Sequence, residues 1–158
     1  MQSITKLDIA KQEAIKSFGF KEKDIDEDYI VIEKLGQGGF GDVYKVESKI
    51  THNIYAAKVI LMAFDDPISE LMSIINEIRA LKTCYHENII RIKDYFITRY
   101  KPIIVIILEY VKEGNLRKYI KPGINRRVIL NVFYQMCEGI QCMHRNDIVH
   151  NDLKPENI

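Results

Sequence analysis

Residues 150–157 of the sequence combine side chains that could carry out phosphoryl transfer. They read His-Asn-Asp-Leu-Lys-Pro-Glu-Asn, so that a carboxylate at Asp152 is followed by an ammonium at Lys154 and a carboxamide at Asn157. Together, these three groups can hold a hydroxyl, a phosphate and a metal ion. The alternative is that Asp152 only forms a turn, because the pattern Asp-x-x-Pro is common in turns.

A glycine-rich segment at residues 36–43 (GQGGFGDV) could bind phosphate groups. It has the pattern GxGxxGxV and joins two predicted strands, which favours a lid over a nucleotide rather than a dinucleotide site, where the glycines lead into a helix. Because side chains are absent, the backbone N–H groups of Gly36, Gly38 and Gly41 can approach a phosphate closely. The alternative is that these glycines only permit a tight hairpin.

Lys58 lies in an otherwise apolar predicted strand, residues 53–60, where an ammonium group needs an anionic partner. On the next predicted helix, Glu77 interrupts an apolar stripe between Ile74 and Ile78. Each residue alone has a simpler explanation, namely a lysine at a strand edge and a solvated glutamate. As a pair they have a purpose, since Glu77 can hold Lys58 against the α- and β-phosphates of a nucleotide.

The composition indicates a globular protein. The chain has 158 residues and is 47% hydrophobic, enough for one compact domain or two small lobes. Its formal net charge is +1 and no basic block is present, which argues against nucleic acid or an acidic membrane as a partner. The three cysteines (Cys84, Cys137 and Cys142) form no CxxC pair, so that neither a zinc site nor a disulfide framework is predicted.

No targeting or membrane segment is predicted. Residues 1–10 lack the continuous apolar stretch of a signal peptide. The longest apolar run, residues 103–108, is far shorter than the roughly 20 residues needed to span a bilayer. We therefore expect a cytoplasmic protein, with a nuclear location left open.

The elements that must position these side chains follow from the apolar periodicity. An amphipathic helix is expected at residues 5–18, ending at Gly19, and the charged stretch at residues 21–28 is expected to separate it from the main domain. Further helices are predicted at residues 66–82, 114–120 and 125–146. Strands are predicted at residues 29–35, 42–48, 53–60, 89–97 and 103–109. The fold class is therefore α+β, with a five-stranded antiparallel sheet and one long helix in its first part.

Four of these features, the glycine-rich turn, Ala56-Ala57-Lys58, Glu77 and residues 150–157, resemble in order and spacing those of eukaryotic protein kinases, in which the last motif reads HRDLKPEN. The resemblance covers residues 29–158 and implies a partial kinase domain after an N-terminal extension at residues 1–28. Residues 29–109 would form the small lobe. Residues 110–158 would hold the hinge, the first helices of a mainly helical large lobe and the catalytic loop.

The resemblance also implies roles in binding ATP. Leu108 resembles the gatekeeper, the backbone of Glu109 and Val111 would bond the adenine edge, and Asn115 would reach the ribose or, alternatively, cap the short helix that follows. The turn glycines would cover the phosphates. Leu35, Val43 and Ala56 would contact the nucleotide, although without the motifs they are ordinary residues of a strand core.

In the catalytic loop, the resemblance assigns Asp152 to the proton of the substrate hydroxyl, Lys154 to the γ-phosphate and Asn157 to a magnesium ion. His150 would be a structural anchor. The pair Lys154-Pro155 resembles the serine/threonine branch, which implies ATP, Mg²⁺ and proteins with Ser or Thr hydroxyls as partners.

Two departures from the family pattern bear on activity. Asn151 replaces an arginine that receives an activation-loop phosphate in many relatives, and a neutral amide binds phosphate more weakly. The sequence, which ends at Ile158, has no DFG aspartate, activation loop or APE segment. Metal stabilisation of a transferring phosphate is worth on the order of several kcal/mol, so we expect low or no activity from this chain by itself.

The alternative hypothesis is a non-catalytic module that binds nucleotide or docks onto another kinase. The helix at residues 125–146 is relevant to docking, because the sequence contains no further helices that would cover its apolar residues. An exposed apolar face of that kind predicts aggregation or a protein partner that covers it.

Overall fold

The computed structural model describes residues 5–38, 41–62, 66–120 and 122–158. The chain forms two compact units. The first takes its residues from 1–79 and 91–110, and the second from 80–90 and 111–158. Each unit is described by itself below. In the described ranges, none of the helices is long and apolar enough to cross a membrane.

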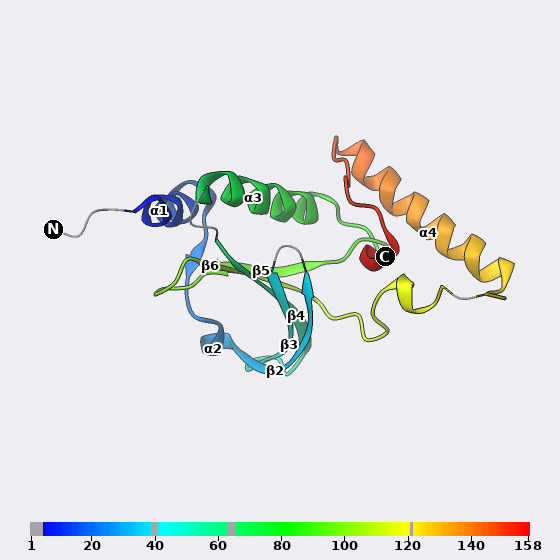
Figure 1. The fold of residues 1–158 in the computed structure, drawn as a ribbon, viewed down its shortest axis with the longest axis horizontal. Helices are drawn as coiled ribbons and strands as arrows, with labels where there is room; N and C mark the ends of the chain where they lie inside the picture. The colour runs from blue at the N-terminus through cyan, green and yellow to red at the C-terminus, as the bar shows by residue number, and fades with distance from the viewer. Residues whose placement is uncertain (1–4, 39–40, 63–65, 121) are drawn as a thin grey trace. The chain divides into compact units, whose positions relative to one another are not determined.

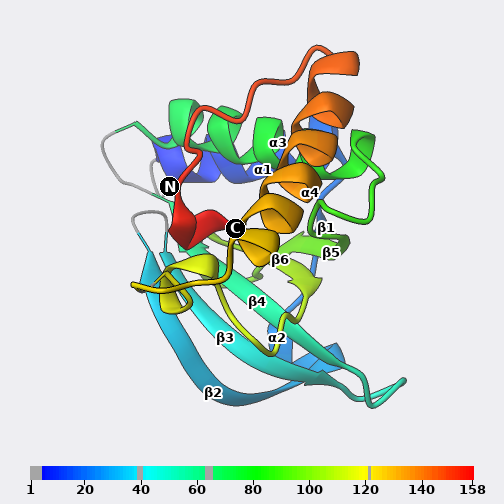
Figure 2. The same cartoon turned by 90° about the vertical axis from the view of Figure 1, so that its right-hand side faces the viewer.

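The first unit is built on a mixed β-sheet with the order β1-β5-β6-β4-β3-β2 (Figure 1). Only the pair β1 and β5 is parallel, and the other neighbours are antiparallel. In Figure 2, β2, β3 and β4 run side by side as long, strongly curved strands. The strands are β1 (Lys21–Glu22), β2 (Tyr29–Gly38), β3 (Gly41–Ser48), β4 (Ile54–Leu61), β5 (Ile92–Ile97) and β6 (Ile103–Glu109).

The α+β class and the five antiparallel strands are confirmed, but the sheet has a sixth strand that was not predicted. This strand, β1, lies inside the charged stretch that we expected to interrupt the structure. A strand of two exposed, charged residues at the edge of a sheet has no hydrophobic periodicity, so the sequence pattern could not indicate it.

Local capping fixes the ends of the first helix. α1 (Lys6–Phe18) begins after Thr5, whose side chain and backbone exchange hydrogen bonds with Asp8 in a capping box. It ends at Gly19, whose left-handed φ of 68° is the conformation that favours glycine at the end of a helix. A single-turn helix, α2 (Ile25–Asp28), leads from β1 to β2.

α3 (Pro67–Thr83) is the long helix predicted after the third strand of the meander. The Oδ1 atom of Asp66 accepts a hydrogen bond from the N–H of Ser69 at 3.2 Å, so Asp66 caps the helix as expected. The buried residues of α3 recur at helical spacing and turn one stripe of the helix to the sheet. They are Pro67, Leu71, Ile74, Ile75 and Ile78.

Two apolar clusters fill the two faces of the sheet, because successive residues of a strand point to opposite sides. On β6, Ile104 and Ile106 enter the first cluster, whereas Val105 and Ile107 enter the second. The first cluster also contains the stripe of α3, and Figure 1 shows α3 and α1 on the same side of the sheet. The second cluster joins Tyr29, Val46, Ala57, Phe96, Val105 and Ile107.

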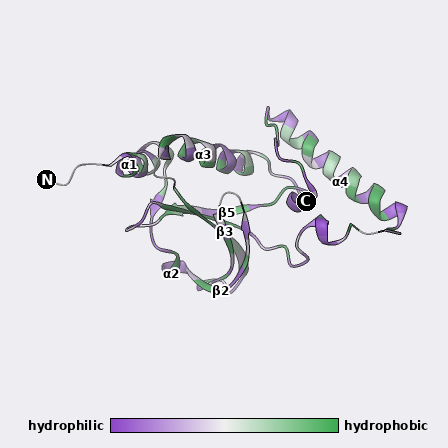
Figure 3. Ribbon diagram, in the orientation of Figure 1, coloured by the Kyte–Doolittle hydropathy of each residue, from purple (hydrophilic) through white to green (hydrophobic). Residues whose placement is uncertain are grey.

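The second unit contains α4 (Arg126–Arg145) and two short 3₁₀ turns, η1 (Leu116–Lys118) and η2 (Pro155–Asn157). α4 is capped by Asn125, whose side chain accepts from the N–H of Arg127 at 2.8 Å. Figure 3 shows hydrophobic and hydrophilic residues alternating along α4, and yet only Gly139 is buried among its residues. Ile129 and Phe133 are exposed, as expected for a helix whose apolar residues have no partner helices within the sequence.

Candidate functional site

A bidentate ion pair joins Lys58 to Glu77. The Nζ atom of Lys58 donates to both carboxylate oxygens of Glu77, at 2.6 Å and 2.8 Å. The lysine side chain is 17% exposed and the glutamate side chain 38%, so the pair lies near the surface of the first unit without being fully solvated. The structure thus brings together two residues that the sequence could only suggest as partners.

The sheet and α3 set the position of this pair. Lys58 on β4 is paired with Ile106 on β6, and cross-strand partners share a face of the sheet. Ile106 is buried in the cluster that contains α3, so Lys58 rises on the side of the sheet that α3 covers. Glu77 follows Ile74 by three residues on α3 and therefore borders its buried stripe.

Gly36 and Gly41 lie at the two ends of the glycine-rich hairpin and have different surroundings. A Cβ atom on Gly41 would lie 2.2 Å from the carbonyl oxygen of Val59, and its φ is +134°, so the fold itself requires glycine there. A Cβ atom on Gly36 would meet no atom of the described residues within 4 Å. The hairpin explanation therefore accounts for Gly41 but not for Gly36. Gly38 pairs with Gly41 in the sheet, and Gly39 and Phe40 lie outside the described residues.

The apolar residues expected next to a nucleotide are partly buried at most. Val43 is paired with Lys58, and Ala56 with Leu108; Lys58 and Ala56 are two residues apart on β4, so these side chains share one face of the sheet. Val43, Ala56 and Leu108 are partly buried, and Leu35 is exposed. A set of apolar side chains that the core does not enclose is compatible with contact to a flat apolar ligand.

The residues expected to hold an adenine and a ribose lie at and beyond the end of β6. The N–H of Glu109 donates to the carbonyl of Arg91 at 2.9 Å, and the carboxylate of Glu109 accepts from the N–H of Arg91, also at 2.9 Å. Only its carbonyl oxygen would then bond a ligand. Val111 is half exposed and uses its carbonyl to accept from the N–H of Gly114, so that its own N–H would be the ligand-binding group.

Asn115 occupies the N-cap position of η1, but its side chain makes no capping hydrogen bond. Its Oδ1 atom is buried and has no hydrogen-bond partner among the described residues. Because an unpaired buried oxygen is unfavourable, the capping alternative leaves Asn115 unexplained, whereas a polar ligand would satisfy it.

Residues 150–157 bring Asp152, Lys154 and Asn157 together. The Nζ atom of Lys154 lies 2.7 Å from the Oδ2 atom of Asp152, and the Nδ2 atom of Asn157 donates to the same oxygen at 2.9 Å. Asn157 also donates to the carbonyl of Asp152 at 2.8 Å. His150 supports the loop, because its carbonyl accepts from the N–H of Asp152 at 2.8 Å. The three side chains from the sequence motif therefore form one polar cluster.

The electrostatics of this cluster favour an ionised aspartate. The hydrogen bonds from Lys154 and then from Asn157 hold the pKa of Asp152 below its ordinary value. The preceding residue, Asn151, has a positive φ of 59°, a conformation that asparagine adopts more readily than most residues. Asn151 thus fits the backbone of the loop, although it lacks the charge of an arginine.

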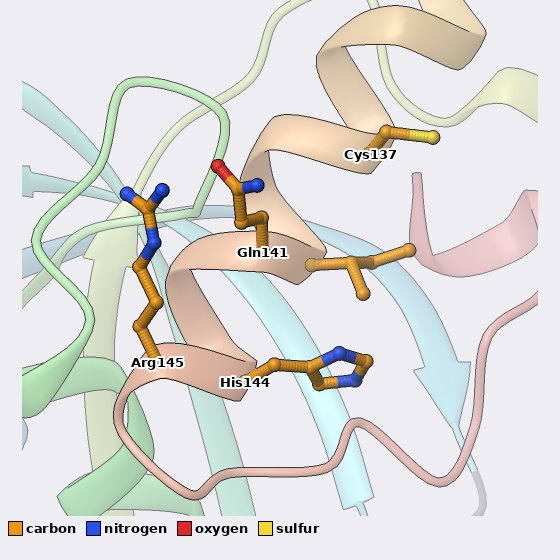
Figure 4. A pocket seen from close by; sticks show the side chains of 5 residues that line it. Cys137, Gln141, His144 and Arg145 are labelled. Carbon is orange, nitrogen blue, oxygen red and sulfur yellow. The ribbon is translucent and has the colours of Figure 1, made fainter.

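A hollow on α4 was not predicted from the sequence, and none of the predicted site residues lines it. In Figure 4, Cys137 and His144 project from one side of the helix, and Gln141 and Arg145 from the other. These positions are three or four residues apart, so the sequence already indicated that their side chains are neighbours on the helix. Within the described part of the chain, no group of three or more His, Cys, Asp or Glu side chains could hold a metal ion.

Comparison with known proteins adds independent evidence. Residues 29–158 match the family described as the protein kinase domain. A protein of Dictyostelium discoideum described as a cyclin-dependent serine/threonine-protein kinase is 33% identical over 136 residues, which cover 84% of this chain and 19% of that protein. The chain thus spans about a fifth of the length of this relative.

Proposed function

This chain belongs to the protein kinase family, and from this premise we propose that it is part of a serine/threonine kinase that transfers the γ-phosphate of ATP to protein hydroxyls. The observation that carries the proposal is the bidentate contact between Lys58 and Glu77. A glutamate that holds the lysine in place preorganises its ammonium group, so that less conformational entropy is lost when the lysine binds the α- and β-phosphates of ATP.

The glycine-rich hairpin supports nucleotide binding through its backbone. Gly36 is a glycine for which the described part of the fold gives no steric reason, because no described atom lies within 4 Å of the space that its Cβ would occupy. A phosphate group can occupy such a space and accept hydrogen bonds from backbone N–H groups. We assign Gly36, Gly38 and Gly41 to the phosphates, and Leu35, Val43 and Ala56 to the apolar face of the base.

The remaining contacts to ATP come from the segment after β6. We assign the carbonyl of Glu109 and the N–H of Val111 to the adenine edge. The buried Oδ1 atom of Asn115 would accept a hydrogen bond from a ribose hydroxyl, which would remove its unpaired state.

In the second unit, we assign Asp152 to the substrate hydroxyl, whose proton it accepts, and Lys154 to the γ-phosphate. Asp152 fits the orienting part of this role, because an ionised carboxylate accepts a hydrogen bond from the hydroxyl; its lowered pKa keeps it ionised but makes it a weaker base. Asn157 fits a magnesium ion in part, since its amide nitrogen is bonded to Asp152 and its amide oxygen is the atom that would reach the metal. A bound magnesium ion would neutralise charge on the phosphates.

The preference for Ser and Thr over Tyr rests on Lys154-Pro155 and on the similarity to the Dictyostelium protein described as a serine/threonine-protein kinase. The exposed apolar residues of α4 favour a second candidate function, a non-catalytic module that binds nucleotide and docks onto another protein. Both candidates include MgATP binding at Lys58. We also propose that the protein is cytoplasmic or nuclear.

Calorimetric titration with MgATP tests the shared step. We expect weak binding by the 158-residue chain and a loss of at least about tenfold in affinity in Lys58→Met, because the ammonium that contacts the phosphates is removed. Lys93→Met is the matched control, since Lys93 is an exposed lysine on β5. Equal heats in the wild type and in Lys58→Met would contradict the proposal.

A further inference from the structure

Residues 5–22 lie outside the region that matches the kinase family, yet their side chains enter the core of the first unit. Ala10 and Ala14 are fully buried, and Phe20 is almost so. A terminal extension without a structural role would keep such residues in contact with solvent or with a partner. Here Ala10, Ala14 and Phe20 pack in the same cluster as the buried stripe of α3, the helix that carries Glu77.

The first attachment of this segment is to the apolar cluster that contains the stripe of α3. Ala10 and Ala14 are four residues apart and therefore share one face of α1. They belong to the same buried cluster as the apolar stripe of α3, and Figure 1 and Figure 2 both show α1 next to the N-terminal part of α3, on the same side of the sheet. The cluster also contains Ile97 of β5 and Ile106 of β6, so α1 shares one apolar core with α3 and with the sheet.

The second contact is with the far edge of the sheet. After the turn at Gly19, the ring of Phe20 packs edge-on against Tyr95 of β5, with a distance of 5.1 Å between ring centroids. Lys21 and Glu22 then pair with Phe96 and Ile97 of β5.

An ion pair of 2.6 Å between Lys11 and Glu22 closes the segment on itself, and Lys11 also donates to the carbonyl of Arg99. Residues 5–22 are thus attached to β5 and to the residues just after it, and their three buried side chains lie in the cluster that contains the stripe of α3.

This double attachment bears on Glu77. α3 touches the sheet through a stripe that Glu77 borders, so a shift or rotation of α3 on the sheet moves the Glu77 carboxylate relative to Lys58. Both contacts of the pair are shorter than 3 Å, and a displacement of about 1 Å can reduce the rate of an enzyme as much as a hundredfold.

We propose that residues 5–22 position α3 and, through it, Glu77, so that Ala10, Ala14 and Phe20 are positioning residues of the site that binds the phosphates of ATP. The inference rests on the proposed function, since the position of Glu77 matters because Lys58 binds nucleotide.

Phe20→Ala tests the proposal, because it removes the ring that fixes the segment to β5. Val46→Ala is the matched control: Val46 is also fully buried, but in the cluster on the opposite face of the sheet. Two quantities are measured in the full 158-residue chain, namely amide hydrogen exchange of residues 71–79 relative to β4, and affinity for MgATP.

We expect Phe20→Ala to speed exchange in residues 71–79 about tenfold more than in β4, and Val46→Ala to affect both segments equally. MgATP affinity should fall about tenfold in Phe20→Ala and stay within about twofold in Val46→Ala. Phe20→Leu, which keeps an apolar side chain at the site, should restore most of the affinity. If Phe20→Ala does not fold, Phe20→Leu replaces it, with the same selectivity for residues 71–79 and a smaller effect.

A double-mutant cycle separates positioning from loss of stability. In a Glu77→Gln background, Phe20→Ala should change MgATP affinity by less than about twofold, because the group through which it acts has already been neutralised. Equal exchange effects on α3 and β4, or an undiminished effect of Phe20→Ala beside Glu77→Gln, would overturn the inference. If the wild type does not bind MgATP, the proposed function fails, and the exchange comparison alone decides the positioning role.

Discussion

Gly36 and Gly41 belong to one sequence motif, and they are glycines for different physical reasons. At Gly41 the backbone of β4 is so close that any side chain would collide with it. At Gly36 the described residues leave open space, which we assign to the phosphates. Single methyl groups can therefore separate the two explanations of the motif, a tight hairpin and a phosphate site.

We expect Gly41→Ala to lower the free energy of unfolding by about 2 kcal/mol or more, because of its positive φ and the contact with Val59. Gly36→Ala should leave that free energy within about 0.5 kcal/mol and weaken MgATP binding. Urea denaturation and calorimetry on both variants give the two quantities. A Gly36→Ala protein that binds MgATP like the wild type would favour the hairpin explanation at this position as well.

The polar cluster at Asp152 predicts a defined response to pH. Lys154 is the largest cause of the lowered pKa of Asp152, so Lys154→Met should raise this pKa towards its ordinary value, and Asn157→Ala should raise it less. Carbon-detected NMR titration of the Asp152 carboxyl measures the shift. Lys112→Met, which replaces an exposed lysine outside the cluster, is the control. Unchanged titration in Lys154→Met would show that the ion pair does not form in solution.

The sign of the linked effect on stability follows from the direction of the shift. A carboxyl group with a pKa that is lower in the folded chain stabilises the fold above its unfolded pKa, and this contribution is lost as the pH falls through the folded pKa. The contribution of Asp152 is therefore fully present at neutral pH and disappears in acid. Since Asp152 is exposed, solvent screens the interaction and keeps the contribution small.

Among the elements, α4 differs from the rest because its apolar residues are in contact with solvent. Phe133 is 61% exposed, whereas Phe96 on β5 is 0% exposed, so substitutions at these two positions should differ in their effect on the free energy of unfolding. Phe133→Lys should leave the free energy of unfolding within about 0.5 kcal/mol and reduce self-association, which exposed apolar surface promotes. Phe96→Ala should lower that free energy by about 3–5 kcal/mol.

Static light scattering and thermal unfolding measure these two effects on α4 and β5. A clear loss of stability in Phe133→Lys would mean that the face of α4 is covered in solution. If a partner protein covers this face, as we propose, it should bind Phe133→Lys more weakly than the wild type.

Elements with local signals could be predicted from the sequence, and elements that depend on distant contacts could not. Asp66 caps α3 and Gly19 ends α1 as expected, and Thr5 and Asn125, where helices were expected to begin, cap them, since capping involves only residues within one turn. β1 was missed because its pairing with β5 joins residues more than 70 positions apart.

The candidate site shows the same division. The pairing of Lys58 with Glu77 could be predicted, because a charge in an apolar strand requires a partner. The space beside Gly36, the unpaired oxygen of Asn115 and the hollow on α4 could not, since each of them depends on what surrounds a residue in three dimensions.

At the scale of the whole molecule, the two units divide the proposed work. The first contains the ion pair and the hairpin assigned to the phosphates of ATP, and the second contains the cluster assigned to the substrate hydroxyl. The second also holds Val111 and Asn115, which we assign to the adenine and the ribose, so variants of Lys58 and of Asp152, and not the units themselves, separate nucleotide binding from phosphate transfer.

We expect a polypeptide of residues 1–158 to bind MgATP weakly and to transfer phosphate slowly or not at all, because Asn157 is the one magnesium ligand that we assign. A phosphotransfer assay with labelled ATP and a Ser/Thr protein substrate measures this, with Asp152→Asn as the control for authentic turnover. Each factor of ten in rate corresponds to about 1.4 kcal/mol in the barrier. Robust turnover that disappears in Asp152→Asn would contradict the expectation.

The place of β1 in the sheet also affects how the protein should be divided for study. A polypeptide that began at Tyr29, where the family match begins, would leave β5 as an unpaired edge strand beside an emptied part of the core. Exposed edges of this kind pair with other chains and lead to aggregation. Poor solubility of such a shortened protein would then report the loss of residues 5–28, and not an intrinsic defect of the kinase domain.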